Sequence, residues 1–345
     1  MQAACAAGAQ RFELKDIPRP EPGDGEVLIR LEACGVCGTD LHFFHGGLLA
    51  PGHTPGHEMV GRVEILGQGV TGLSLGSRVA IEPVRYCGRC SHCVAGRTSV
   101  CRGFQIHGIH LPGGFAEYAV VPASGAFAVC EEATPAVAAL AEPLAVAVHG
   151  IRRGGLEKGQ RVLVLGAGAV GLTTLLSARA AGAGEVWMSA RHENQAEMAM
   201  SLGAHRVLRE EEATPEALGP LGMSTDFDLV VESVGGTADT VRAACAAVRP
   251  SGTVTVLGVF MAPVSIDPMP ALLKEVNIAW SNCYHHPSDE QADFAAATQL
   301  IADQHELLER LTTHQYPLSR IEEAFATAGN KRSGAIKVSV IHASE

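Results

Sequence analysis

The sequence predicts an α/β protein with two parts, a mostly-β part followed by a doubly wound parallel sheet. Up to about Val148 the chain consists of short strand-like runs separated by turns. From about Arg161, apolar strands alternate with alanine-rich helical segments, which is typical of a parallel sheet with right-handed crossovers. A chain of 345 residues is also too long for one ordinary domain and suits two.

The predicted strands of both parts are short runs of aliphatic and β-branched residues. In the first part, Gly, Pro or Asp bounds the runs at Glu26–Leu31, Gly61–Ile65 and Arg78–Ile81. In the second part, the strands are expected at Arg161–Leu165, Glu185–Ser189, Phe227–Val231 and Thr253–Leu257. The last stretch predicts two helices and a closing strand, at Asp293–Ile301, Ser319–Ala328 and Ala335–Ile341.

Composition limits the classes of function. Hydrophobic residues make up 47% of the chain and charged residues 18%, so large cores can form. The formal net charge of −11 argues against a nucleic acid or an anionic membrane as partner, because both require a basic surface. The first residues lack the features of a signal peptide, and we expect a cytoplasmic protein. In such a protein, ten cysteines point to metal binding or catalysis.

A glycine pattern follows the strand Arg161–Leu165. Gly166 suits a tight turn, Gly168 lets the backbone approach a pyrophosphate, and Gly171 allows a helix to pack on the strand. The pyrophosphate would lie at the helix N-terminus, beside Ala169 and Val170. The alternative, a flexible glycine turn, is disfavoured because a strand precedes the pattern and a helix follows it.

The end of the next strand predicts which nicotinamide cofactor is used. An NAD-binding unit usually carries Asp or Glu near Ala190, but here Arg191 and His192 follow. Arg191 can pair with the 2′-phosphate of NADP, so NADP is favoured over NAD. Alternatively, Arg191 is a solvated charge, and Glu193 or a neighbour binds the ribose. Two residues that follow later strands complete the predicted cofactor contacts, Val234 and Gly258.

Four cysteines lie close together in one glycine-containing loop. Cys87, Cys90, Cys93 and Cys101 have the spacing C-x2-C-x2-C-x7-C. Four thiolates at this spacing can enclose a tetrahedral zinc ion with no open position, which is the composition of a structural site. An iron–sulfur cluster and disulfides are the alternatives, and the tight spacing favours zinc.

A second set of potential ligands is spread along the sequence. Cys37, His57 and a carboxylate such as Glu142 suit a zinc ion that keeps one position open for substrate. Each residue alone is a weak signal. A lone His or Cys is more often packed in a core, and Glu142 alone could cap a helix.

Taken together, these motifs resemble the zinc-containing medium-chain dehydrogenases. The resemblance rests on Cys37-Gly38-Thr39-Asp40-x-His42, Gly56-His57-Glu58, the four-cysteine loop and the glycine pattern, in that order. It extends to Thr313–Leu318 and Ile321–Phe325 and so covers essentially the whole chain. The segment from Glu142 to His149 is similar to the polyol (sorbitol) and butanediol dehydrogenase branch.

The resemblance implies a domain organisation. A barrel-like, mostly-β (GroES-like) catalytic domain would comprise residues 1–147 and 286–345, with a structural zinc lobe at about 84–104. A Rossmann domain that binds NAD(P) would be inserted at 148–285, and the active site would lie in the cleft between the domains. A homodimer or homotetramer is expected.

The resemblance also implies roles for individual residues. Cys37, His57 and Glu58 would be the inner zinc ligands, and Glu142 would bind directly or through water. Thr39 would take the substrate proton, and His42 would relay it to solvent. The reaction would transfer hydride between a secondary alcohol and a nicotinamide cofactor, with a polyol, vicinal diol, amino alcohol or cyclitol as the alcohol.

Two other functions are possible for such a chain. A reductase of enones or quinones from the same superfamily would lack the catalytic metal set, which is present here. A non-catalytic cofactor-binding protein would not need the predicted catalytic groups, all of which are present. We therefore expect a zinc-dependent dehydrogenase with two zinc ions per chain.

Overall fold

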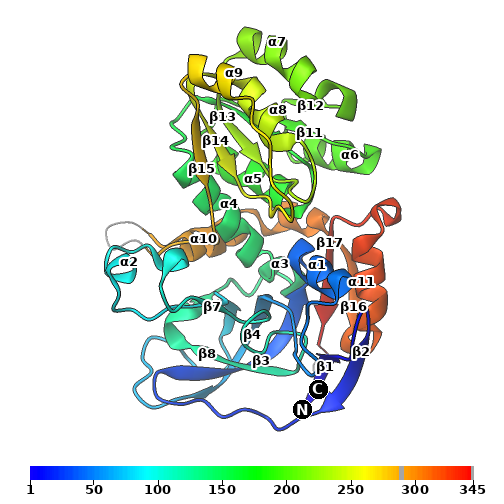
Figure 1. Cartoon of the computed structure of the whole chain (residues 1–345). Helices are drawn as coiled ribbons and strands as arrows, with labels where there is room; N and C mark the ends of the chain where they lie inside the picture. Colours follow the sequence, from blue (N-terminus) through cyan, green and yellow to red (C-terminus); the bar gives the residue numbers. More distant parts are fainter. Residues whose placement is uncertain (287–290, 343–345) are drawn as a thin grey trace. The chain divides into compact units, whose positions relative to one another are not determined.

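The computed structural model describes residues 1–286 and 291–342, and the described chain forms two compact units (Figure 1). The first unit joins Met1–Glu142 to His285–Glu345, and the second is the intervening segment Pro143–Tyr284. The first unit therefore contains both ends of the chain. No helix in the described residues is both long and apolar enough to cross a membrane.

A seven-stranded sheet dominates the first unit. Its strands follow the order β16-β17-β3-β4-β5-β9, and β8 also pairs with β3. Their bounds are β3 (Glu26–Gly35), β4 (Glu58–Leu66), β5 (Arg78–Ile81), β8 (Tyr118–Pro122), β9 (Ala126–Ala128), β16 (Thr312–Pro317) and β17 (Lys337–Ile341). Strand β17, near the end of the chain, pairs antiparallel with β3. This pairing brings the last described segment against the motifs near the start.

Smaller elements complete the first unit. Two-stranded sheets are formed by β1 (Gln2–Ala6) with β2 (Phe12–Asp16) and by β6 (Val84–Arg85) with β7 (Gln105–Ile106). The helices are α1 (Gly38–Gly46), α2 (Ser91–Val94), α3 (Pro135–Ala138), α10 (Asp293–Leu308) and α11 (Ile321–Gly329). Short 3-10 turns lie at Thr98–Val100, Ala123–Gly125, Glu309–Leu311, Leu318–Arg320 and Lys331–Ser333.

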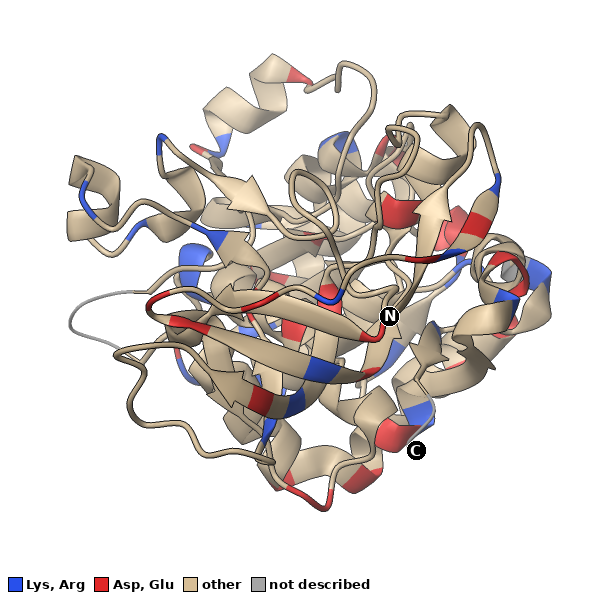
Figure 2. Ribbon diagram, turned by 90° about the horizontal axis from the view of Figure 1, so that it is seen from below, with Lys and Arg blue, Asp and Glu red and all other residues tan. Residues whose placement is uncertain are grey.

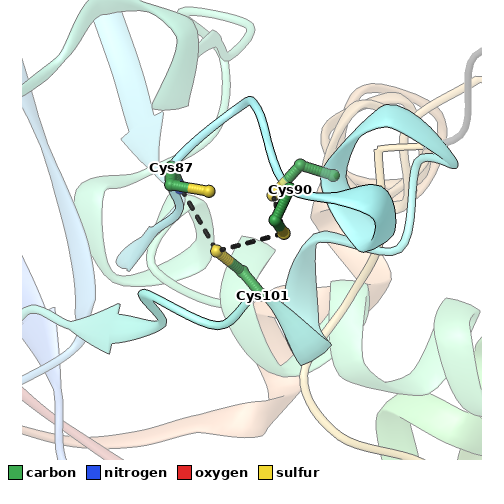
Figure 3. Close-up of side chains that lie close together, drawn as sticks. Cys87, Cys90 and Cys101 are labelled. Atoms are coloured by element: carbon green, nitrogen blue, oxygen red, sulfur yellow. Dashed lines mark hydrogen bonds between the residues drawn. The ribbon is translucent and has the colours of Figure 1, made fainter.

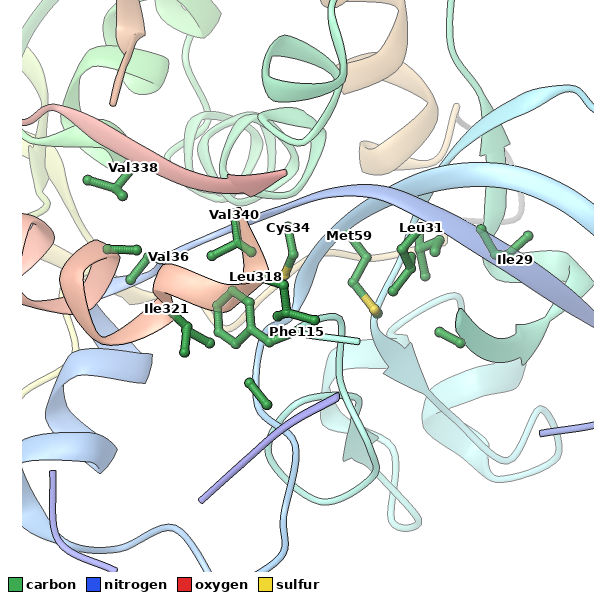
Figure 4. Close-up of a cluster of buried hydrophobic side chains, with 14 of the residues drawn as sticks. Ile29, Leu31, Cys34, Val36, Met59, Phe115, Leu318, Ile321, Val338 and Val340 are labelled. Atoms are coloured by element: carbon green, nitrogen blue, oxygen red, sulfur yellow. The ribbon is translucent and has the colours of Figure 1, made fainter. Parts of the chain in front are cut away.

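The core of the first unit joins segments that are distant in sequence. Figure 4 shows side chains of β3, β4 and β17 meeting Phe115 and Ile321 in one buried cluster. Phe115 is fully buried, and Ile321 begins α11. Apolar burial of this kind is the main favourable term in folding, so the cluster fixes β17 beside β3.

Strand β3 continues beyond its predicted end at Leu31 because the charge of Glu32 is neutralised. The Glu32 carboxylate accepts hydrogen bonds from Arg78 Nε at 2.6 Å and Arg62 Nε at 2.9 Å. A buried carboxylate is tolerated when it is paired in this way. The apolar run can therefore resume after Glu32 and reach Gly35.

The second unit is a six-stranded parallel sheet with helical connections. Its strand order is β12-β11-β10-β13-β14-β15, and all neighbouring strands are parallel. The strands are β10 (Arg161–Leu165), β11 (Glu185–Ser189), β12 (Arg206–Leu208), β13 (Phe227–Glu232), β14 (Val248–Val256) and β15 (Asn277–Trp280). This is the 3-2-1-4-5-6 order of dinucleotide-binding sheets, and it confirms the predicted fold class.

The connections of the second unit are mostly helices. They are α4 (Ala141–Arg153), α5 (Ala169–Ala180), α6 (Glu193–Ser201), α7 (Pro215–Thr225), α8 (Thr240–Ala247) and α9 (Pro268–Leu273), with a 3-10 turn at Glu210–Glu212. Helix α4 begins at the end of the first unit and continues into the second. Figure 2 shows acidic and basic residues interspersed along the ribbon.

Candidate metal and cofactor sites

The four cysteines of the predicted lobe converge. The sulfur atoms of Cys87, Cys90, Cys93 and Cys101 all lie within 4.8 Å of one another. Cys90 Sγ lies 3.5 Å from Cys93 Sγ. It lies 4.0 Å from Cys101 Sγ (Figure 3). A tetrahedron with zinc–sulfur bonds of about 2.3 Å has edges of about 3.8 Å. These two distances bracket that edge, so the geometry fits a tetrahedral metal ion.

Backbone amides around the sulfur atoms lower the pKa of Cys87 and Cys90, whereas burial raises the pKa of Cys93 to about 12. The amides of Cys87 and Gly103 both donate to Cys101 Sγ at 3.2 Å. Hydrogen bonds from the Arg102 and Cys93 amides lower the pKa of Cys90 to about 5. The thiolate is the form that binds metal, so the loop already provides part of the required charge state.

A second set of ligand atoms lies in the first unit. Cys37 is the residue before α1, and His57 and Glu58 lie at the start of β4. One ligand atom from each residue lies within 4.8 Å of the others, and both His57 and Glu58 are buried. A thiolate, an imidazole and a carboxylate at this spacing suit a zinc ion with an open position.

Asp40 lies beside two members of this set, a placement that the sequence did not reveal. Its Oδ2 accepts the backbone N–H of Cys37 at 2.9 Å, and its Oδ1 lies 3.5 Å from His57 Nδ1. Burial lowers the pKa of His57, but Asp40 and Cys37 outweigh burial and hold that pKa well above its usual range. Carboxylates that orient metal-binding histidines commonly take this position. The signal in the sequence was an acidic residue in the first turn of α1.

A buried lysine is the second residue that sequence reasoning missed. Lys337 on β17 forms an ion pair with Glu58 and donates a hydrogen bond to the carbonyl of Val36 at 3.2 Å. Burial lowers the pKa of Lys337, but Glu58, Cys37 and Glu142 outweigh it and raise that pKa above its usual value. The sequence signal that could have revealed this residue was a lysine in the otherwise apolar closing strand.

The remaining predicted catalytic residues lie on two helices. Thr39 and His42 lie three residues apart on α1, which places them on the same helix face. Thr39 is partly buried and His42 is exposed. Glu142 is buried near the start of α4, and its charge acts on Lys337. The roles assigned to these three residues stay predictions.

The glycine pattern in the second unit has the backbone that its predicted role requires. Gly166 has a φ of 100°, a conformation that favours glycine. A Cβ on Gly171 would collide with the carbonyl oxygen of Gly166. A Cβ on Gly168 would meet no atom within 4 Å, and this residue caps the N-terminus of α5. The space at Gly168 suits the approach of a pyrophosphate.

The residues after β11 leave the cofactor preference as a prediction. Ala190 is buried, and His192 is the residue before α6. The Arg191 side chain is 71% exposed, with its Nε 3.3 Å from Glu210 Oε2. Glu193, the alternative ribose ligand, pairs instead with Arg209 at 2.8 Å.

Val234 and Gly258 follow β13 and β14, where Glu232 shapes the loop. The Glu232 carboxylate accepts the amides of Val234 at 2.8 Å and Gly235 at 2.9 Å. A Cβ on Gly258 would collide with that carboxylate. Local packing therefore already requires glycine at 258, and the two cofactor contacts stay predictions.

Comparison with known families gives two matches. Residues 23–131 match the alcohol dehydrogenase GroES-like domain, and residues 169–303 match the zinc-binding dehydrogenase family. Together the matched segments cover more than half of the chain. They include Cys37, His57, Glu58, the four-cysteine loop and part of the glycine pattern.

Individual proteins are similar over much or all of the chain. The L-threonine 3-dehydrogenase of Pyrococcus furiosus is 37% identical over 262 residues, 74% of each chain. A zinc-binding dehydrogenase of Sinorhizobium meliloti, solved bound to NADP, is 33% identical with a TM-score of 0.87 over 99% of this chain and 98% of that one. The 2R,3R-butanediol dehydrogenase of Bacillus subtilis is 26% identical with a TM-score of 0.85 over 99% of both.

Proposed function

Since the chain belongs to the zinc-containing medium-chain dehydrogenase family, we propose that it oxidises a secondary alcohol, or reduces the matching ketone, with NADP favoured over NAD. The observation that carries this proposal is the convergence of Cys37, His57 and Glu58 in the unit that contains both chain ends. A reductase without a catalytic metal would have no need of this buried donor set.

The metal set supports the chemistry of the proposal. Cys37 and His57 would hold zinc, and Asp40 would keep the His57 ring oriented through its Nδ1 side. A zinc ion there would act as a Lewis acid on the substrate oxygen, and a nicotinamide would accept the hydride. The four-cysteine loop would hold a second zinc ion with a purely structural role.

The proton would leave along α1. In this proposal, the Thr39 hydroxyl accepts the proton of the substrate hydroxyl and at the same time gives its own proton toward His42, which releases a proton to solvent. The i, i+3 spacing and the increase in exposure from Thr39 to His42 support this route.

The cofactor preference rests on charge at the end of β11. No carboxylate stands at Ala190, and Arg191 is exposed enough to reach a 2′-phosphate. The similar dehydrogenase of Sinorhizobium meliloti was solved with NADP, which supports this preference. The 2′-phosphate would have to draw Arg191 away from Glu210, an exposed pair that is weak.

The proposed substrate is a class of alcohol and not a single compound. L-threonine and 2,3-butanediol, the substrates named for two similar proteins, are both secondary alcohols with a polar group on the next carbon. We infer that this chain also takes a secondary alcohol with such a neighbouring group. The polyol and butanediol branch stays a prediction, as does a dimer or tetramer.

Initial rates would test the proposal. The zinc-loaded protein is assayed with NADP and NAD in parallel against L-threonine, 2,3-butanediol, sorbitol and inositol. We expect turnover of at least one alcohol, faster with NADP, and loss of turnover in Cys37→Ser with 2′,5′-ADP binding retained. Binding of zinc and both cofactors without turnover of any of these alcohols would contradict the proposal.

A further inference from the structure

The chain returns from the second unit to the first at His285 and His286, and polar contacts hold both of these returning residues. The Asp293 carboxylate at the start of α10 accepts the backbone N–H of His285 at 2.7 Å. The imidazole of His286 pairs with the carboxylate of Glu82, the residue after β5. The Glu82 side chain is fully buried, so this carboxylate depends on its partner for charge compensation.

The charges around His286 favour its protonated form. Burial lowers the pKa of the imidazole, but Glu82 and Asp293 outweigh burial and raise that pKa above its usual value. Burial also raises the pKa of Glu82, and His286 opposes that effect. Glu82 Oε1 has no hydrogen-bond partner among the described residues. The contact from His286 to Oε2 is therefore the one that this carboxylate can least lose.

Two aromatic rings contact the imidazole, and one of them belongs to the residue that leads into the four-cysteine loop. The centroid of the His286 ring lies 5.7 Å from that of Tyr86 and 5.6 Å from that of Phe127 on β9. Phe127 also packs against Phe294 of α10, with a centroid distance of 5.2 Å. Tyr86 directly precedes Cys87, so a potential metal ligand lies next to one of these contacts.

The four-cysteine loop has too little packing of its own to hold Tyr86 in place. Strands β6 and β7 are two residues each, and α2 has no buried residue. Elements this short are marginal in water, so a metal bound by the cysteines would supply the order of the loop. If the loop opens, Tyr86 leaves His286, and water reaches an ion pair that burial otherwise strengthens.

We propose that the four-cysteine loop is a metal-dependent device that controls the returning residues. With a metal bound, Tyr86 keeps His286 paired with Glu82, and loss of the metal releases the returning residues and the start of α10. This inference rests on the proposed function only in taking the four cysteines as metal ligands. It gives that site a defined effect on residues that are distant from it in the sequence.

Hydrogen exchange at residues 296–301, in the first turns of α10, reports this release. Cys90→Ser should speed exchange there and in residues 84–104, while β10 of the second unit exchanges as in wild type. We expect an increase of about 3- to 10-fold at residues 296–301, the range that one aromatic contact can supply. Zinc content, measured on the same samples, should fall by one ion per chain.

Three further variants test whether Tyr86 carries the effect. Tyr86→Leu should retain full zinc content and speed exchange at residues 296–301, and adding Cys90→Ser to it should have no further effect there. Tyr118→Leu, at a partly buried tyrosine of β8, should preserve the full response to Cys90→Ser. Cys37→Ser removes a ligand of the other candidate site and should leave residues 296–301 protected.

The proposal is overturned if Cys90→Ser loses zinc and opens residues 84–104 but leaves residues 296–301 unchanged. It is also overturned if the effects of Tyr86→Leu and Cys90→Ser at residues 296–301 add, since the two changes would then act independently. Full zinc content in Cys90→Ser would refute it as well, because the four cysteines would not hold the metal. No turnover is measured, so the full expected pattern in a protein that oxidises no alcohol would refute the proposed function alone.

Discussion

Single side chains at the two candidate sites act through charge. Asp40 bridges the Cys37 backbone and the His57 ring, and Lys337 offsets the negative charge around Glu58. At the cofactor loop, Arg191 and Arg209 each pair with a glutamate. Buried charges such as Asp40 resist substitution more than exposed ones, because their partners cannot turn to water.

Replacing Asp40 with Asn should loosen the catalytic metal site. Loss of the carboxylate leaves the His57 ring without its charged partner, and such changes cost about 10- to 100-fold in metal affinity or activity. Zinc content after dialysis and kcat for the best alcohol would measure both effects. Asp24→Asn, at an exposed turn, is the control. Wild-type kcat and zinc retention in Asp40→Asn would remove Asp40 from the site.

Reversing the charge of Arg191 should affect NADP and spare NAD. A charge-assisted hydrogen bond to the 2′-phosphate is worth about 1.5–3 kcal/mol, so Arg191→Glu should weaken NADP binding about 10- to 100-fold. Calorimetric titration with 2′,5′-ADP and with 5′-AMP separates the contribution of the phosphate. Arg242→Glu, on α8, serves as the matched exposed variant. Equal losses for both nucleotides would refute the role of Arg191.

Among the elements, the four-cysteine lobe has little apolar core of its own. Strands β6 and β7 are two residues each, and α2 has no buried residue. Elements this short are not stable alone, since helices and hairpins of this size are marginal in water. Metal binding is therefore expected to order residues 84–104.

Replacing Cys90 with Ser should remove one zinc ion per chain and open this lobe. Three remaining thiolates cannot close a tetrahedral shell, so the free energy of metal binding no longer supports the fold there. Zinc analysis and hydrogen exchange of residues 84–104 would show both changes. Cys130→Ser, at a cysteine outside both sets of potential metal ligands, should behave as wild type. Full zinc content with unchanged exchange in Cys90→Ser would exclude a structural zinc ion.

At the scale of the molecule, the first unit depends on contacts between the two ends of the chain. β17 pairs with β3. His342, the residue after β17, forms hydrogen bonds with two segments that lie much earlier in the sequence. The His342 amide donates to the Glu32 carbonyl at 2.9 Å, and its Nε2 lies 3.1 Å from the Gly114 carbonyl oxygen. Nδ1 of this buried ring has no hydrogen-bond partner among the described residues.

Acidification should destabilise the protein through His342. Burial lowers the pKa of its imidazole to about 4, whereas the unfolded chain titrates near 6.5. Below about pH 6.5 the unfolded state binds the proton first, so stability falls as pH decreases, by up to about 3 kcal/mol at pH 4. The free energy of unfolding would be measured from pH 7.5 to 4.5 for wild type and His342→Gln.

The variant should lose less stability than wild type over this range, because its amide can still donate to Gly114 and does not titrate. His45→Gln, at an exposed position on α1, should follow the wild-type curve. Parallel curves for wild type and His342→Gln would show that His342 is protonated equally in both states.

The sequence by itself determined the features that depend on near neighbours. The strands Arg78–Ile81, Arg161–Leu165 and Glu185–Ser189 have the predicted bounds, because aliphatic runs between turn residues fix them locally. The fold class and the family also follow from motifs of closely spaced residues. The sulfur atoms of the four cysteines converge because one short loop carries them all.

Only the tertiary structure decided the contacts that depend on strand neighbours. The edge strands β12 and β15 are short, and no local pattern predicted them. The approach of Lys337 to Glu58 requires β17, β3 and β4 to lie side by side with Gly35 between them. Asp40 meets His57 for the same reason, since sheet pairing brings distant segments together. Sequence periodicity specifies which face of a strand is buried, whereas packing of the whole unit selects its neighbours.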